Sequence, residues 1–116
     1  MPHVVLNGTV EMIDIFQQLS PIMIRYEKTL LKTSDKYMNF NETSILVESL
    51  AIEDGNKIGF LVLLGKREDG IVVRIYPEFG IEKTNGVKKI LASIAQQLLE
   101  QISELKIGKT NLQEFL

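Results

Sequence analysis

The residue of this chain best suited to chemistry is Pro2, which directly follows Met1. A methionine in front of a small residue is commonly removed, and the proline then carries a free secondary amine. Such an amine can act as a base or a nucleophile where low-dielectric surroundings lower its pKa. Pro2 is therefore the candidate catalytic residue. The alternative is an ordinary second residue that has no chemical role.

Lysines form the second candidate group. Lys83, Lys88 and Lys89 lie at the start of an amphipathic stretch, residues 84–105. The first turn of a helix offers free backbone N–H groups and the positive end of the helix dipole, and both favour an anion. We predict that these lysines bind a small carboxylate or another anion. The alternative is a solvated group of lysines with little net effect.

No cofactor and no metal site is predicted. The chain has one histidine, His3, and no cysteine. Neither a zinc site of the His/Cys type nor a Cys-His pair can be built from this set. Gly65, Gly70 and Gly80 stand singly, so no glycine-rich phosphate loop is present either.

Charge and hydropathy exclude two classes of partner. Thirteen basic and fifteen acidic residues give a net charge of -2, which lacks the basic excess that drives phosphate contacts with nucleic acid. No apolar run approaches the roughly 18 residues that span a bilayer, and no signal peptide pattern opens the chain. We expect a cytoplasmic protein that contacts neither nucleic acid nor membrane.

The elements that must position these residues begin with a short strand. The run from His3 to Leu6 has strand composition, and Asn7-Gly8 ends it with turn residues. Apolar residues then recur at helical spacing from Val10 to Leu30, which predicts helix. Pro21 interrupts this pattern and predicts either a kink or a fresh helix start. The polar residues 31–43 predict a connecting loop.

Three strand-like runs follow, and turn residues separate them. The first, Ile45 to Ile52, ends at Asp54-Gly55, and the second, Ile58 to Leu64, ends at Asp69-Gly70. The third covers residues 71–76. Because Asp-Gly pairs favour tight turns between antiparallel strands, the three runs predict a meander.

Residues 84–105 predict the longest helix, since their apolar residues keep to steps of three and four. Lysines occupy its first turns and glutamates its last turns, which is the reverse of what the helix dipole favours. Gly108 is expected to cap this helix. Residues 109–116 are then a short tail with enough apolar character to dock, including onto a neighbouring subunit.

The middle run of the meander is apolar on both faces, from Ile58 to Leu64. A strand of this kind needs cover on both sides, and two helices can cover only one. The sequence therefore predicts a single α+β domain, residues 1–116, in the order β-α-β-β-β-α. Its four-stranded sheet would have two main helices on one face, and its second face would be buried by homo-oligomerisation.

Two segments of the chain resemble the tautomerase superfamily, within it the 5-carboxymethyl-2-hydroxymuconate isomerases. Family members open with Met-Pro-His and a short strand, as Met1-Pro2-His3 and the residues after it do here. A second similarity covers residues 72–75, Gly80, Lys83 and Thr84, where the family has a strand, a glycine-containing loop and a long helix. The family's arginines on the second strand are not matched, because residues 45–49 are apolar and acidic.

This resemblance implies a cofactor-independent tautomerase or isomerase. The processed Pro2 would be the general base that moves a proton within a small enolisable carboxylate. Lys83, Lys88, Lys89 or Arg74 would bind the carboxylate, and the resemblance also implies a trimer. The alternative is a non-catalytic oligomeric module that binds a protein partner or a small anion at the same helix end. The sequence leaves open whether the protein is an enzyme and whether it is a dimer or a trimer.

Overall fold

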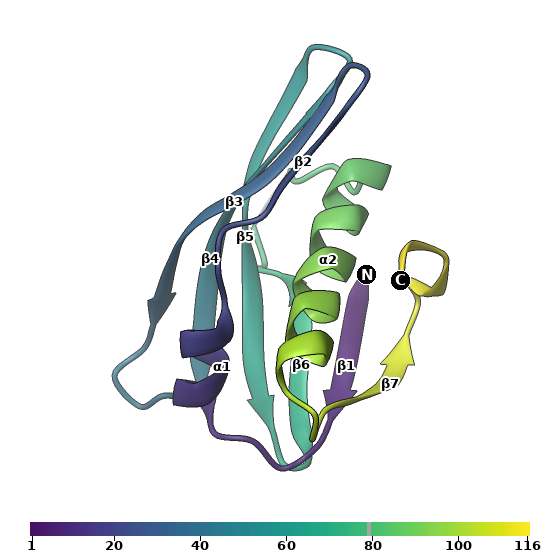
Figure 1. The fold of residues 1–116 in the computed structure, drawn as a ribbon. Coiled ribbons are helices and arrows are strands. Elements are labelled where there is room, and N and C mark those ends of the chain that lie inside the picture. The colour runs from purple at the N-terminus through teal and green to yellow at the C-terminus, as the bar shows by residue number, and fades with distance from the viewer. Residues whose placement is uncertain (79) are drawn as a thin grey trace.

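The computed structural model of the chain describes residues 1–78 and 80–116. These residues form seven strands, two α-helices and one short 3-10 helix (Figure 1). In chain order the elements are β1 (His3–Asn7), α1 (Met12–Gln18), β2 (Met23–Tyr26), β3 (Thr29–Met38), β4 (Ser44–Glu53), β5 (Asn56–Arg67), β6 (Gly70–Ile75), α2 (Asn85–Gln101), β7 (Lys106–Thr110) and η1 (Gln113–Phe115).

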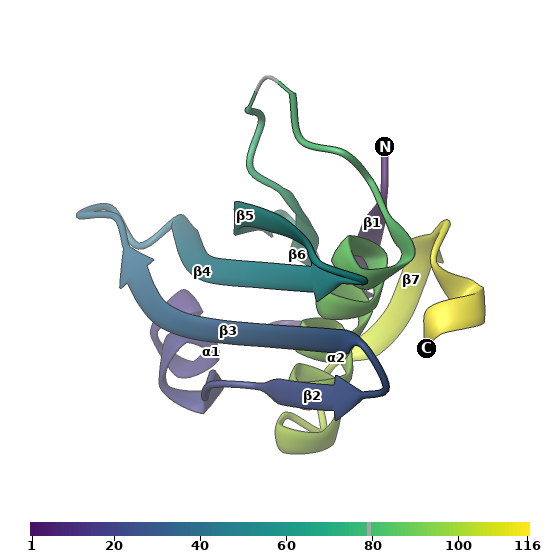
Figure 2. The ribbon, with the colours of Figure 1, turned by 90° about the horizontal axis from the view of Figure 1, so that it is seen from above.

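All seven strands belong to one antiparallel sheet, in the order β2-β3-β4-β5-β6-β1-β7. The sheet curls partly around α2, and both helices lie on its concave side (Figure 2). The predicted four-stranded sheet and the order β-α-β-β-β-α are therefore wrong. The sheet gains β2, β3 and β7 from segments that were predicted to be helix, loop and tail.

The helical prediction fails after Gln18, where α1 ends. Ile22 and Ile24 alternate with exposed residues, which is the two-residue period of a strand. The structure follows this period, because β2 pairs with β3, with Ile24 opposite Leu31. Pro21 lies in the connection between α1 and β2. It neither kinks a helix nor begins one, so both sequence expectations for it are wrong.

The segment predicted to be a loop contains the ten-residue strand β3. Its polar composition hides the strand, because only a few of its side chains enter the core, such as Leu31 and Thr33. A bulge between Thr33 and Lys36 further disturbs the alternation of its inward and outward residues.

The predicted meander is confirmed by the pairing of β4 with β5 and of β5 with β6. Its first turn has the predicted chemistry, because Asp54 and Gly55 have φ values of 52° and 89°. Two consecutive residues with positive φ are what a type I′ hairpin turn requires.

The long helix was predicted over residues 84–105, and α2 covers most of that range. Thr84 is its N-cap, and the hydroxyl accepts a hydrogen bond from the backbone N–H of Val87 at 3.2 Å. The helix ends at Gln101, but Ile102 and Leu105 are still buried. The apolar stripe therefore continues beyond the helix that it predicts.

Gly108 does not cap this helix, because it lies within β7, which pairs with β1. A Cβ at Gly108 would stand 2.7 Å from Nδ2 of Asn7, so a side chain at this position would have to displace the Asn7 amide. The end of the chain packs on its own domain, with Leu112 fully buried and Lys89 Nζ donating to the Phe115 carbonyl at 3.2 Å.

The outer face of the sheet includes Leu61 and Leu63, which alternate with the buried Phe60, Val62 and Leu64. Leu61 and Leu63 are only partly exposed in the single chain. These side chains therefore do not need a second subunit to cover them. Self-association stays a prediction.

Candidate functional site

Three of the predicted site residues line one pocket. Pro2, Lys83 and Lys88 surround a cavity of about 230 Å³ together with Met1, Asn111 and Leu112. Pro2 directly precedes β1, Lys83 precedes α2, and Lys88 lies in the first turns of α2. The fold thus brings the candidate base to two candidate anion-binding residues that are distant from it in the sequence. We call this cavity the N-terminal pocket.

Hydrogen bonds to Asn111 fix the backbone at Pro2. The backbone N–H of His3 donates to Oδ1 of Asn111 at 3.0 Å, and Nδ2 of Asn111 donates to the Met1 carbonyl at 2.8 Å. Nδ1 of His3 makes a 2.9 Å hydrogen bond to the same carbonyl. Because a carbonyl only accepts, this ring nitrogen is the donor. Two donors therefore converge on the oxygen that precedes Pro2.

Sequence reasoning missed Asn111. The segment was predicted to be a tail, whereas β7 pairs with β1 and leaves Asn111 beside the first residues of the chain. The hydroxyl of Thr110 strengthens this link by donating to the His3 carbonyl at 2.7 Å. No local sequence pattern marks a five-residue strand that contains two lysines and a glycine.

The other two predicted residues lie elsewhere. Lys89 does not line the N-terminal pocket, and its ammonium donates to the Phe115 carbonyl. Arg74 alternates in β6 with the buried Val73 and Ile75, so its side chain belongs to the outer face of the sheet. The helices lie on the opposite face (Figure 2), which separates Arg74 from the N-terminal pocket.

The start of α2 already has an anion from its own chain. Glu53, the last residue of β4, accepts hydrogen bonds from the Thr84 hydroxyl and, at 3.1 Å, from the backbone N–H of Gly86. A Cβ at Gly86 would stand 2.6 Å from the carboxyl carbon of Glu53, so this glycine leaves space for the carboxylate. Glu53 thereby supplies the negative charge that the first turn of the helix lacks.

The lysines of the N-terminal pocket have no such partner. Within residues 1–78 and 80–116, the one ion pair that lies within 4.0 Å joins Lys28 to Asp54 at 3.8 Å. Lys83 is exposed and Lys88 is half-buried. Two lysines without a carboxylate therefore line the pocket that holds Pro2.

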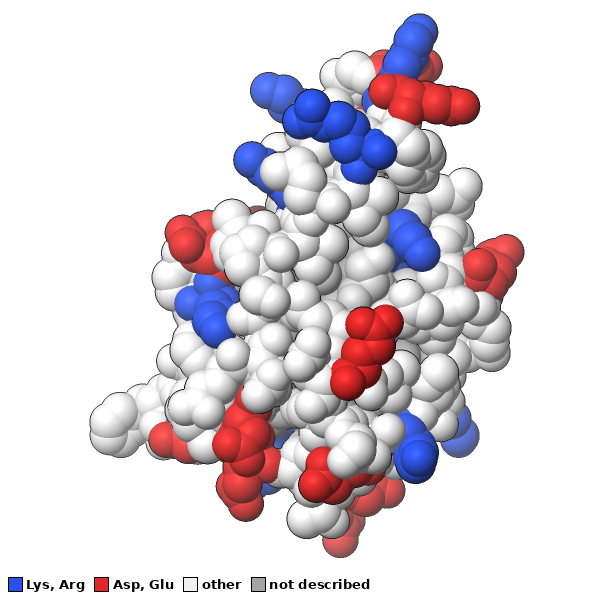
Figure 3. All heavy atoms as spheres, viewed as in Figure 1, with Lys and Arg blue, Asp and Glu red and all other residues white. Residues whose placement is uncertain are grey.

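Charge is distributed unevenly over the molecule. On the face shown in Figure 3, basic side chains gather toward the end where the β2–β3 and β4–β5 hairpins project, with acidic side chains at the tip itself, and acidic side chains predominate at the opposite end. The first turn of α2 lies toward the basic end (Figure 1).

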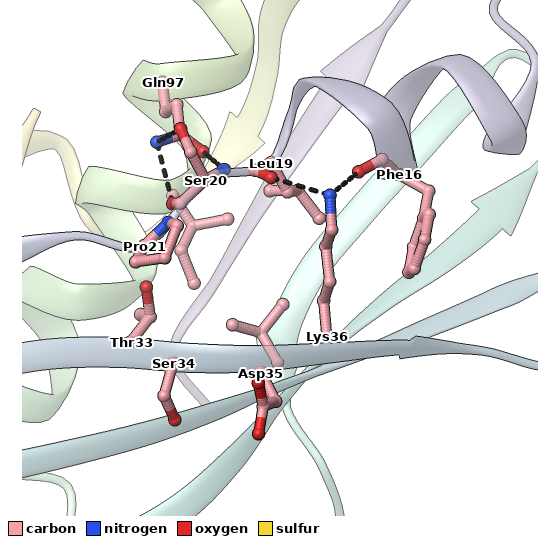
Figure 4. A pocket seen from close by; sticks show the side chains of 11 residues that line it. Phe16, Leu19, Ser20, Pro21, Thr33, Ser34, Asp35, Lys36 and Gln97 are labelled. Carbon is pink, nitrogen blue, oxygen red and sulfur yellow. Dashed lines mark hydrogen bonds between the residues drawn. The ribbon is translucent and has the colours of Figure 1, made fainter.

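A second cavity lies between the end of α1, strand β3 and helix α2. Its volume is about 360 Å³, and it is lined by Phe16, Leu19, Ser20, Pro21, Thr33, Ser34, Asp35, Lys36, Val47, Ile94 and Gln97 (Figure 4). The ammonium of Lys36 donates to the carbonyls of Phe16 at 2.6 Å and Leu19 at 2.8 Å. None of these residues was predicted to form a site. We call this cavity the α1–β3 pocket.

Comparison of the chain with family models, curated proteins and solved structures finds no match. The resemblance to tautomerases therefore stays a prediction. Among the described residues, no group of three or more His, Asp or Glu side chains could hold a metal ion. No helix in this part of the chain has the length and apolar content needed to cross a membrane.

Proposed function

We propose that the protein binds a small carboxylate in the N-terminal pocket. The observation that supports this best is the meeting of Pro2, Lys83 and Lys88, which lie far apart in the sequence and line one cavity. Lysine ammonium groups attract a carboxylate as point charges on flexible stems, without the planar fork of arginine. The cavity of about 230 Å³ is of a size for a compact acid.

We propose further that Pro2 acts as a general base once Met1 has been removed. Two cationic side chains and a partly enclosed site would lower the pKa of a free Pro2 amine and keep a fraction of it neutral. That amine would accept the enol O–H proton of the bound acid. The ammonium would return a proton to the substrate carbon, so the keto form is released and no proton is consumed overall.

The contacts of Met1 support this second step. Asn111 and His3 both donate to the Met1 carbonyl in the unprocessed chain. Removal of Met1 would leave both donors facing the vacated space next to the Pro2 nitrogen. A substrate oxygen in that space would accept the same hydrogen bonds, which would hold the reacting group against the amine.

Replacing Lys83 and Lys88 with glutamine is expected to weaken the binding of phenylpyruvate. Each charge-assisted contact that is lost should raise the Kd about tenfold, equivalent to about 1.4 kcal/mol. Isothermal titration calorimetry of the single and double variants measures this. Lys57→Gln is the matched control, because Lys57 is exposed at the start of β5 and does not line the pocket. Equal affinity in the wild type and the double variant would contradict the proposed binding site.

Pro2→Leu is expected to slow ketonisation of the enol of phenylpyruvate by about 10²–10⁴-fold, the usual contribution of a general base. A large second residue keeps Met1 in place, so this variant has no free amine at position 2. The rate is followed by absorbance, and mass spectrometry of each purified protein reports its N-terminus. A retained Met1 in the wild type, or an unchanged rate in the variant, would exclude Pro2 as the base while leaving the binding proposal open to the lysine variants.

A further inference from the structure

The α1–β3 pocket has an apolar floor and a polar rim. Leu19, Val47 and Ile94 form the floor and are at most 6% exposed. The rim includes the hydroxyl of Thr33 and the ammonium of Lys36 (Figure 4). With a volume of about 360 Å³, this cavity lies within the usual range for small-molecule sites, and its combination of apolar floor and few polar groups is typical of them.

The β3 bulge places Lys36 in this pocket. Thr33 pairs with Ser49 and Lys36 pairs with Val47, so two residues of β3 stand opposite the single residue Glu48 of β4. In a regular strand the residue three positions after the inward Thr33 would face outward. The extra residue reverses this, and Lys36 therefore shares the inner face with Val47. Bulges commonly re-aim a side chain in this way next to functional sites.

The charge of Lys36 is not neutralised. Its ammonium has three N–H groups, and two of them donate to the carbonyls of Phe16 and Leu19. Among the described residues no carboxylate lies within 4.0 Å of it. The neighbouring Asp35 points away from the ammonium, toward the other side of the strand (Figure 4). The half-buried ammonium thus keeps one N–H donor, without a carboxylate partner among the described residues, at the rim of an apolar cavity.

We propose that the α1–β3 pocket binds an amphipathic monoanion, such as a medium-chain carboxylate. The apolar chain lies against Leu19, Val47 and Ile94, and the carboxylate accepts a hydrogen bond from the third N–H of Lys36. The hydroxyl of Thr33 is a further donor, because its oxygen accepts from the backbone N–H of Ile22 at 2.9 Å and its hydrogen is free for a ligand. This site is independent of the N-terminal pocket.

A purely structural role for Lys36 makes a different prediction. Contacts with the last carbonyls of α1 and with the Phe16 ring, whose centroid lies 4.6 Å from Nζ, would stabilise the helix end without any ligand. In that case Lys36 substitutions change stability only. A binding role requires that the substitution also changes which ligands the protein prefers.

The test compares octanoate with octanol by isothermal titration calorimetry on the full chain. The wild type is expected to bind octanoate at least about tenfold more tightly than octanol, because only the carboxylate gains from the cation. Lys36→Met keeps the apolar stem, and it is expected to bind the two probes equally. Lys36→Arg is expected to retain the preference for octanoate.

Val47→Phe fills the floor of the cavity and is expected to abolish binding of both probes. Circular dichroism shows whether each variant is folded. If Val47→Phe does not fold, the Lys36→Met and Lys36→Arg variants still test the proposal. The Lys83→Gln/Lys88→Gln double variant should bind octanoate as the wild type does, which separates this site from the N-terminal pocket. Absence of octanoate binding to the wild type, or a preference for octanoate that survives in Lys36→Met, would overturn the proposal.

Discussion

Replacing Gly70 with alanine is expected to destabilise the protein by about 3–4 kcal/mol, because two penalties add at this position. Gly70 has a φ of 156°, which residues with a side chain rarely adopt. A Cβ built on it would also collide with the carbonyl oxygen of Leu6 and stand 3.0 Å from Cα of Asn7. Both obstacles are backbone atoms of β1, so relief requires moving a central strand.

Thermal unfolding followed by circular dichroism measures this effect, and the midpoint should fall by roughly 10–20 °C. Gly59→Ala is the matched control from the neighbouring strand β5. Its φ is ordinary, and nothing lies within 4 Å of a Cβ built there. Its stability should change by less than about 0.5 kcal/mol. Similar losses in the two variants would contradict the close packing of the β5–β6 turn against β1.

The predictable part of the fold consists of the segments whose apolar residues fit only one type of secondary structure. Strands β4, β5 and β6 are bounded by turn residues, and Asp54-Gly55 adopts the backbone that its composition predicts. Helix α2 is likewise predictable, because no other periodicity fits its apolar residues. In these segments local preference and tertiary packing favour the same structure.

The segment between α1 and β4 was not predictable, because its residues fit two periodicities. Spacings of three and four favour a helix over residues 10–30, whereas the pairing of Ile24 with Leu31 requires strands. The bulge at β3 then removes the alternation that would mark that strand, since Thr33 and Lys36 share the inner face at a spacing of three. Tertiary pairing decides here against the helical spacing.

The candidate site was predictable only in its residue types. Pro2, Lys83 and Lys88 were identified from chemistry and dipole arguments, and the curl of the sheet brings them together. The position of Asn111 depends on β7, which is too short and too polar to predict from its own residues. Glu53 accepts hydrogen bonds at the start of α2, a contact between residues far apart in the sequence, whereas the ligand anion expected at the lysines stays a prediction.

Glu53→Ala is the second change with a large expected effect, a loss of about 2–3 kcal/mol, because hydrogen bonds to a charged acceptor are the stronger class. The carboxylate accepts from the Thr84 hydroxyl and from the Gly86 backbone, and it compensates for a helix start that has no acidic residue of its own. Urea unfolding of the wild type and the variant measures the loss. The isosteric Glu53→Gln keeps one acceptor oxygen but no charge. Its free energy of unfolding should lie between those of the wild type and Glu53→Ala.

A double-mutant cycle with Thr84→Val isolates the contact itself. Because Thr84 both donates to Glu53 and accepts from Val87, the two substitutions should lose less together than the sum of their separate losses, by about 1 kcal/mol. Added sulfate should then stabilise Glu53→Ala more than the wild type, since the variant leaves the first turn of α2 without its internal anion. Strict additivity, with an equal response to sulfate in both proteins, would show that Glu53 does not satisfy this helix end. In that case no acidic side chain would offset the lysines in the first turns of α2. The free backbone N–H groups of this turn would then be available, together with Lys83 and Lys88, to bind an anion.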